Sequence, residues 1–166
     1  AALTGHLVLS TLHTNSAAAT VSRLLNMGLE SYILGSTIIG IVAQRLVRSI
    51  CTDCRVKEPL TDPVMIRYIE SLGLEPPKEV YRGKGCPVCR STGYRGRTAI
   101  AEVLIFNKEI RQAVERGAGE AEILDIAVRS GMTTLQHAAV EKLVNGVTTV
   151  DEIIRTVYSV DMEDDL

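Results

Sequence analysis

Two Cys-x-x-Cys motifs constrain the fold of this sequence more than any other feature. All four cysteines of the 166-residue chain lie in them: Cys51 and Cys54 in the first motif, Cys86 and Cys89 in the second. Two residues between thiolates allow one tight turn to direct both sulfurs to the same ion, and two such turns complete a tetrahedral S4 site. We therefore predict a structural zinc site, because four thiolates leave no open position for a catalytic water.

Two other uses of the cysteines fit the sequence less well. Two disulfides would need an oxidising compartment, and no segment of this sequence has the pattern of a secretory signal. A redox dithiol is usually a single Cys-x-x-Cys in a thioredoxin-like unit, whereas this chain has two motifs. Basic residues close in sequence would offset the two net negative charges of a zinc tetrathiolate: Arg55, Lys57, Arg82, Lys84 and Arg90.

The first 50 residues have the pattern of an α/β domain. Residues 6–13 form a short, largely apolar stretch, which favours a strand buried on both faces, as in a parallel sheet. Thr14, Asn15 and Ser16 are N-cap residues, and we predict a helix over 17–27. One strand–turn–helix step cannot form a sheet, so we expect the chain to begin within a larger domain. A second helix is predicted over 31–49, with Gln44, Arg45 and Arg48 within one turn of each other.

The rest of the chain predicts a cysteine module followed by helices. The module covers 50–97, with a helix near 63–72 between its cysteine motifs and a glycine-rich basic loop over 93–97. A strand over 98–106 follows, in which Glu102 is an exception to the apolar pattern. A small bundle of helices is then predicted over 108–116 after the N-cap Asn107, over 120–130, over 135–145, and from the capping box Thr149–Glu152 to about Tyr158. A short acidic tail follows at 161–166.

Composition and charge exclude some function classes. The longest apolar run lies within 32–43 and is too short to span a bilayer, which needs about 20 residues. The net charge is −2, and the basic excess around the cysteines does not reach the footprint of a nucleic-acid-binding module. Exposed aromatics interleaved with basic residues, as expected of a single-strand binder, are also sparse.

Polar residues at 10–15 are the strongest candidates for chemistry outside the cysteines. They follow the predicted strand and precede a helix N-terminus, where open α/β sheets bind ligands and where anions such as phosphate are favoured. His13 at this position can contact a phosphate or orient a water, although helix capping explains Thr14 and Asn15 equally well. Four arginines are candidate phosphate or interface contacts, or simply a solvated basic face: Arg45, Arg48, Arg95 and Arg97.

Three segments together resemble a known family. Leu3–Asn15 looks like the histidine box of bacterial secretion ATPases, and Gln44–Arg48 followed by the two cysteine motifs matches the same family in the same order. The run Gly93–Val103, Gly-Tyr-x-Gly-Arg-x-Ala-Ile-x-Glu-Val, also matches. The chain resembles, over essentially its whole length, the C-terminal part of the type II secretion ATPase (GspE) and type IV pilus assembly ATPase (PilB) family.

This resemblance implies a specific fold and activity. It implies the C-terminal portion of a RecA-like core at 1–49, a tetracysteine zinc module at 50–97, and a strand plus helical bundle at 98–166. It also implies a homo-hexamer at the cytoplasmic face of the inner membrane that hydrolyses ATP with Mg²⁺ and drives pseudopilus or pilus assembly through membrane platform proteins. His13 would lie near the terminal phosphate as the catalytic residue of the set. Nucleotide or subunit contacts would come from His6, Thr11, Arg45, Arg48 and Arg97.

The sequence lacks the part that such an ATPase needs for hydrolysis. In the family the Walker A loop and the acidic residues precede the segment that this chain resembles, and no G-x-x-x-x-G-K-[ST] occurs here. We therefore expect that this chain alone does not hydrolyse ATP. The leading hypothesis is a part of a type II secretion motor. A pilus assembly ATPase, a stand-alone zinc interaction module and a redox switch are the alternatives.

Overall fold

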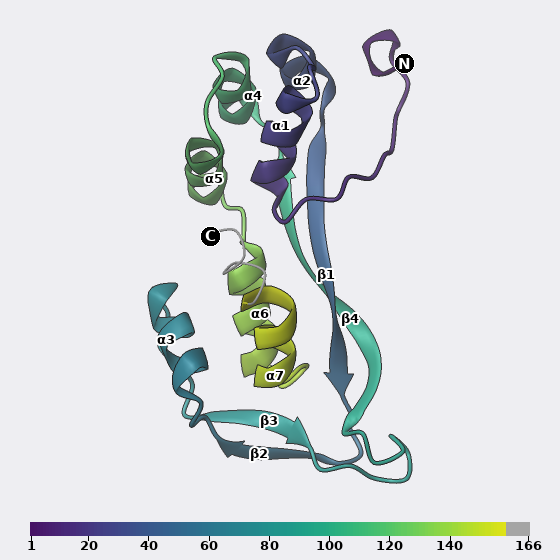
Figure 1. Cartoon of the computed structure of the whole chain (residues 1–166), viewed down its shortest axis with the longest axis vertical. Helices are drawn as coiled ribbons and strands as arrows, with labels where there is room; N and C mark the ends of the chain where they lie inside the picture. The colour runs from purple at the N-terminus through teal and green to yellow at the C-terminus, as the bar shows by residue number, and fades with distance from the viewer. Residues whose placement is uncertain (159–166) are drawn as a thin grey trace. The chain divides into compact units, whose positions relative to one another are not determined.

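The chain folds into two compact units, seen in a computed structural model that describes residues 1–158 (Figure 1). The first unit comprises residues 1–43 and 102–134, and the second comprises 44–101 and the described residues from 135 onwards. Two long strands, β1 (Gly40–Ile50) and β4 (Tyr94–Ile105), are hydrogen-bonded neighbours and contribute residues to both units. They run antiparallel, because the Phe106 amide donates to Ile39 at one end and the Cys51 amide donates to Gly93 at the other.

The first unit is mainly helical. Its elements are the 3₁₀ turn η1 (Ala2–Thr4), α1 (Ala17–Asn26), α2 (Ser31–Thr37), α4 (Lys108–Glu115), α5 (Glu120–Arg129) and the adjoining ends of β1 and β4. Ser16 caps α1 by accepting from the Ala19 amide, and Asn107 caps α4 by accepting from the Ile110 amide. Both caps confirm the sequence prediction. Apolar side chains of the helices and strands form the buried core: Val21, Leu34, Leu104, Phe106, Ile110, Val114, Ile123 and Ile126.

The described residues of the second unit form a hairpin, three α-helices and a π-helical turn. The antiparallel hairpin consists of β2 (Arg55–Pro59) and β3 (Glu79–Gly83), with Arg55 opposite Gly83 and Pro59 opposite Glu79. The helix α3 (Pro63–Ser71) lies between them in sequence, as predicted, and begins at the side-chain cap of Asp62. The remaining elements are α6 (Leu135–Val144), α7 (Val150–Ile153) and the π-helical turn η2 (Ile154–Tyr158). The core contains Val47, Met65, Ile69, Val80, Ile100, Leu143 and Ile153.

Three sequence predictions are wrong. Residues 6–13 form no strand and are exposed, Leu9 to 88%, because no strand of the described residues pairs with them. The predicted helix 31–49 ends at Thr37, and β1 replaces its second half, so Gln44 and Arg45 point to opposite faces of a strand. The predicted loop 93–97 is largely the beginning of β4.

The overall class is mixed α/β, as predicted, but both sheets of the described residues are two-stranded and antiparallel. The predicted C-terminal helices are confirmed individually, yet α4 and α5 belong to the first unit and α6 and α7 to the second. The acidic tail at 161–166 lies outside the described residues. Among residues 1–158, no helix has the length and apolar character needed to cross a membrane.

Candidate metal centre and histidine loop

The two cysteine motifs meet at one point of the second unit. The first lies between β1 and β2, and the second lies between β3 and β4. All four Sγ atoms are within 4.8 Å of one another. The Sγ distance is 3.9 Å for Cys51–Cys86, 3.9 Å for Cys54–Cys89 and 3.7 Å for Cys86–Cys89.

These distances fit a tetrahedral zinc site. Zinc–sulfur bonds of about 2.3 Å at tetrahedral angles place the sulfurs about 3.8 Å apart. The observed separations are also far longer than a disulfide bond of about 2.05 Å, and all four cysteines are free thiols. The predicted ligand set is thus brought together, and the two-disulfide alternative does not apply. A bound zinc would supply a structural cross-link between the two motifs.

Backbone contacts hold the two motifs against each other. The Cys51 amide donates to the Gly93 carbonyl, and the Lys84 amide donates to the Cys54 carbonyl. Gly83 and Gly93 approach so closely that a Cβ on Gly93 would lie 2.6 Å from the Gly83 oxygen. Gly93 also has a φ of +78°, in the region that L side chains rarely adopt. Glycine is therefore required at this crossing of the chain.

Backbone amides also prepare the thiols for a metal. Burial would raise the pKa of the Cys89 thiol, but the amides of Cys86 and Gly93 donate to its Sγ and lower the pKa to about 6. Burial and the neighbouring thiols instead raise the pKa of Cys54 to about 12. A metal ion binds the thiolate form, and N–H groups aimed at sulfur stabilise that form. The amides of Cys86 and Gly93 therefore support a metal-bound Cys89.

The flanking basic residues are used within the hairpin. Lys57 and Arg82 form ion pairs with Glu79 and Glu58 across the two strands. Arg55 lies 4.8 Å above the ring of Tyr81. These three cations thus stabilise β2 and β3 through carboxylate and aromatic contacts.

An ion pair joins the half-exposed Arg48 to the buried carboxylate of Glu152 in the second unit. The Glu152 side chain is completely buried and accepts from the Arg48 backbone amide at 2.7 Å, from Arg48 Nε at 2.8 Å and from Arg48 Nη2 at 2.7 Å. Arg155 Nη2 lies 3.0 Å from the same carboxylate. Burial opposes the charge, but the Arg48 side chain and amide outweigh it and lower the pKa of Glu152 to about 2.

The aromatic ring of Tyr94 completes this network. The Arg48 guanidinium lies 4.0 Å above its centroid, a cation–π contact. Sequence analysis read Glu152 only as the last residue of a capping box. The cap itself is confirmed, since Thr149 Oγ1 accepts from the Glu152 amide at 3.4 Å. The carboxylate, however, binds Arg48, and nothing in the sequence pattern signalled that partner.

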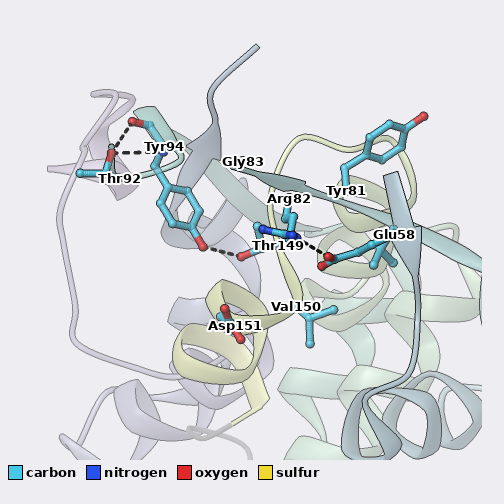
Figure 2. A pocket seen from close by; sticks show the side chains of 10 residues that line it. Glu58, Tyr81, Arg82, Gly83, Thr92, Tyr94, Thr149, Val150 and Asp151 are labelled. Atoms are coloured by element: carbon cyan, nitrogen blue, oxygen red, sulfur yellow. Dashed lines mark hydrogen bonds and ion pairs between the residues drawn. The ribbon is translucent and has the colours of Figure 1, made fainter. Parts of the chain in front are cut away.

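A cleft of about 300 Å³ lies beside this network (Figure 2). Figure 2 shows the Tyr94 hydroxyl directed to Thr149, with 2.8 Å between the two oxygens. The charged residues that line the cleft are Glu58, Arg82 and Asp151, and Glu58 forms an ion pair with Arg82. The cleft is therefore lined by polar groups that are largely engaged with one another.

The predicted phosphate-contact residues are distributed over both units. His6, Thr11 and His13 lie in the exposed segment before α1, where His6 Nδ1 is 3.1 Å from Thr4 Oγ1. Arg45, Arg48 and Arg97 belong to the second unit, on β1 and β4. The four predicted metal ligands, by contrast, all lie in one cluster.

Glu102 is a second residue that sequence analysis did not assign. It is 3% exposed in the middle of β4, and its Oε1 accepts from the Ala17 amide at 2.6 Å. The signal was present, because an acidic residue interrupts an apolar strand pattern. Its partner, 85 positions away, could not be read from that pattern.

Comparison with known proteins identifies relatives along nearly the whole chain. Residues 1–155 match the family model described as type II/IV secretion system protein. The chain is 44% identical to the type II secretion system protein E of Pectobacterium carotovorum subsp. carotovorum, over 93% of this chain and 30% of that protein. It is 46% identical to the protein of the same name from Xanthomonas campestris pv. campestris, over 93% of this chain and 27% of that protein. It is 44% identical to the type IV pilus assembly ATPase PilB of Thermus thermophilus, over 93% of this chain and 17% of that protein. The chain thus spans less than a third of the length of these relatives.

Proposed function

This chain belongs to the family of type II/IV secretion system proteins, and we propose that it forms the C-terminal portion of a hexameric motor ATPase for type II secretion. The observation that carries this proposal is the match over residues 1–155, with several relatives named type II secretion system protein E. In this proposal the motor couples ATP hydrolysis to pseudopilus assembly. Its partners are further copies of itself and platform proteins of the inner membrane, at the cytoplasmic face.

The proposed motor divides its tasks along the sequence. Residues 1–49 complete a RecA-like nucleotide-binding core, 50–97 form the zinc module, and 98–166 supply a strand and helices. Phosphoryl transfer needs a phosphate-binding loop, its lysine and a Mg²⁺ held by acidic residues. The 166 residues contain no such loop, so the longer protein must supply it, and the isolated chain is expected to be inactive.

Within this chain the proposed nucleotide contacts centre on His13. Its exposed side chain, with Thr11 and His6 on the same segment, is available to a phosphate. Arg45, Arg48 and Arg97 are the proposed nucleotide or subunit contacts. The Arg48 guanidinium already binds Glu152 and covers Tyr94, so we expect its removal to affect the second unit before it affects a nucleotide.

Zinc is the proposed ion of the cysteine cluster. Four thiolates are soft ligands, and Sγ separations of 3.7–3.9 Å fit the tetrahedral arrangement that zinc prefers. The cluster joins the loop after β1 to the loop before β4. It would therefore hold the hairpin β2–β3 rigidly to those parts of β1 and β4 that belong to the second unit.

A chimaera tests this proposal directly. The matching segment of the Xanthomonas campestris type II secretion system protein E would be replaced by this chain, and Mg²⁺-dependent ATP hydrolysis and secretion measured in a strain lacking that protein. We expect hydrolysis and secretion from the chimaera, and no hydrolysis from the isolated 166-residue chain. A zinc-loaded, correctly assembled chimaera without turnover would contradict the proposal, and turnover by the isolated chain would contradict the division of tasks.

The second candidate function is pilus assembly. It rests on the 44% identity to PilB of Thermus thermophilus, which equals the identity to the Pectobacterium protein. A matching chimaera in that PilB, tested for pilus assembly, separates the two systems. If both chimaeras hydrolyse ATP but support neither secretion nor pilus assembly, the alternative of a stand-alone zinc interaction module would be favoured.

A further inference from the structure

Glu102 is a buried acid at a position where an apolar residue would be expected. Its neighbours on the same face of β4, Ile100 and Leu104, are 0% and 1% exposed, and Glu102 itself is 3% exposed. A buried carboxylate destabilises a fold unless hydrogen bonds replace the lost water. The hydrogen bond between Glu102 and the start of α1 therefore offsets the cost of burying this carboxylate.

The carboxylate sits at the first backbone amide of α1. Its Oε1 accepts from the Ala17 amide at 2.6 Å, a short charge-assisted bond. Two of the next amides are also bound, since Ala19 donates to Ser16 Oγ at 2.9 Å and Thr20 donates to the Ser16 carbonyl at 3.3 Å. The positive end of the helix dipole thus already faces a negative charge of the chain itself.

A second carboxylate fixes the same turn from another element. Ser16 Oγ donates to Glu120 Oε1 at 3.1 Å, and Glu120 is the first residue of α5. The hydroxyl oxygens of Thr14 and Thr20 lie 2.7 Å apart, so a hydrogen bond joins Thr14, at the start of the turn, to α1. The turn 14–17 therefore has contacts with β4, with α5 and with its own helix.

We propose that Glu102 is a positioning residue that fixes the turn 14–17 and thereby the backbone that directly follows His13. A helix N-terminus would ordinarily be available to a phosphate, but here the Ala17 amide is bound by Glu102. Under the proposed function, a phosphate near His13 would therefore be bound by side chains of this segment and not by the Ala17 amide. The inference that Glu102 fixes the turn depends only on the contacts described above. The inference that a phosphate binds near His13 rests on the proposed function.

Local hydrogen exchange of the zinc-loaded 166-residue chain tests the positioning. Glu102→Met keeps an unbranched buried side chain but removes the acceptor, and Glu102→Gln keeps one acceptor oxygen without the charge. Glu109→Gln is the matched control, because Glu109 is an exposed acid on α4 of the same unit. A charge-assisted bond corresponds to about a tenfold or larger change in local opening.

The expected order separates a positioning role from a general structural one. Amide exchange over residues 14–20 should rise about tenfold or more in Glu102→Met, less in Glu102→Gln, and not in Glu109→Gln. Protection of α4 and α5 should stay unchanged in all three. Unchanged exchange at 14–20 in Glu102→Met would overturn the proposal. A rise spread over the whole first unit, or loss of folding in Glu102→Met together with no local rise in Glu102→Gln, would overturn it equally.

ATP turnover is measured separately, so the two proposals fail in different ways. In the active chimaera, Glu102→Met should lower turnover and Glu102→Gln should restore most of it. An inactive parental chimaera counts against the proposed function and leaves the exchange result standing. Local loosening with normal turnover in Glu102→Met would overturn the link between Glu102 and the His13 site.

Discussion

Acid should destabilise the second unit through Glu152, and the structure gives the size of the effect. The buried carboxylate accepts three hydrogen bonds from Arg48 and forms an ion pair with Arg155. These contacts lower its pKa from 4.5 to about 2. A depressed pKa means that the folded protein binds this proton more weakly than the unfolded chain. A difference of about 2.5 pKa units corresponds to about 3 kcal/mol of unfolding free energy.

The sign of the effect defines the pH window. The contribution is fully present above the unfolded pKa of about 4.5 and is lost as the pH falls towards the folded pKa of about 2. Glu152→Gln removes the charge while keeping the side chain's shape. The difference in stability between wild type and Glu152→Gln should therefore be up to about 3 kcal/mol at pH 7 and should shrink steadily between pH 5 and pH 2.5.

Urea unfolding of the zinc-loaded proteins, followed by circular dichroism at several pH values, measures this difference. Urea is chosen because guanidinium chloride would screen the ion pair. Glu141→Gln is the control, since Glu141 is an exposed acid on α6. Acid also displaces zinc, but that loss is common to the three proteins and cancels in the comparison. A gap between wild type and Glu152→Gln that stays constant from pH 7 to pH 2.5 would refute the assigned role.

Two further predictions concern the cysteine cluster. Gly93→Ala should cost about 3 kcal/mol or more, because a methyl group there meets the facing backbone at 2.6 Å, whereas Gly96→Ala at a similar φ with open space should cost only about 1 kcal/mol. Equal costs by chemical unfolding would argue against the close approach. Removal of zinc with a chelator should raise amide exchange over residues 51–93 and spare α4 and α5 of the other unit. Uniform protection after chelation would count against a structural metal.

The sequence was sufficient for features with local causes. Four cysteines in two Cys-x-x-Cys motifs predicted a cluster of thiols, which the structure shows, since each motif needs only its own turn to aim two sulfurs. Ser16 and Asn107 were recognised as caps for the same reason, because a cap binds an amide three positions away. These predictions required no knowledge of distant segments.

Predictions failed where a distant partner decides the structure. Residues 31–49 were read as one helix that is apolar nearly all round until Gln44, although the β-branched residues of its second half also suit a strand. This second half pairs with β4, which begins at Tyr94, and that pairing selects the strand. Residues 6–13 show the converse error, because their pattern suits a buried strand but among residues 1–158 no strand pairs with them. Periodicity describes a preference, whereas hydrogen-bonded neighbours determine the outcome.

The two buried acids, Glu102 and Glu152, are stabilised in the same way, and this similarity leads to a last prediction. Glu102 and Glu152 each accept from a backbone amide of a distant segment, at Ala17 and Arg48 respectively. They belong to different compact units. Residues without shared partners have additive effects to within about 0.5 kcal/mol. In the double variant Glu102→Gln/Glu152→Gln, exchange should therefore rise in each unit by the amount of the single variant. A rise in the first unit caused by Glu152→Gln alone would show that the carboxylates act through a common network.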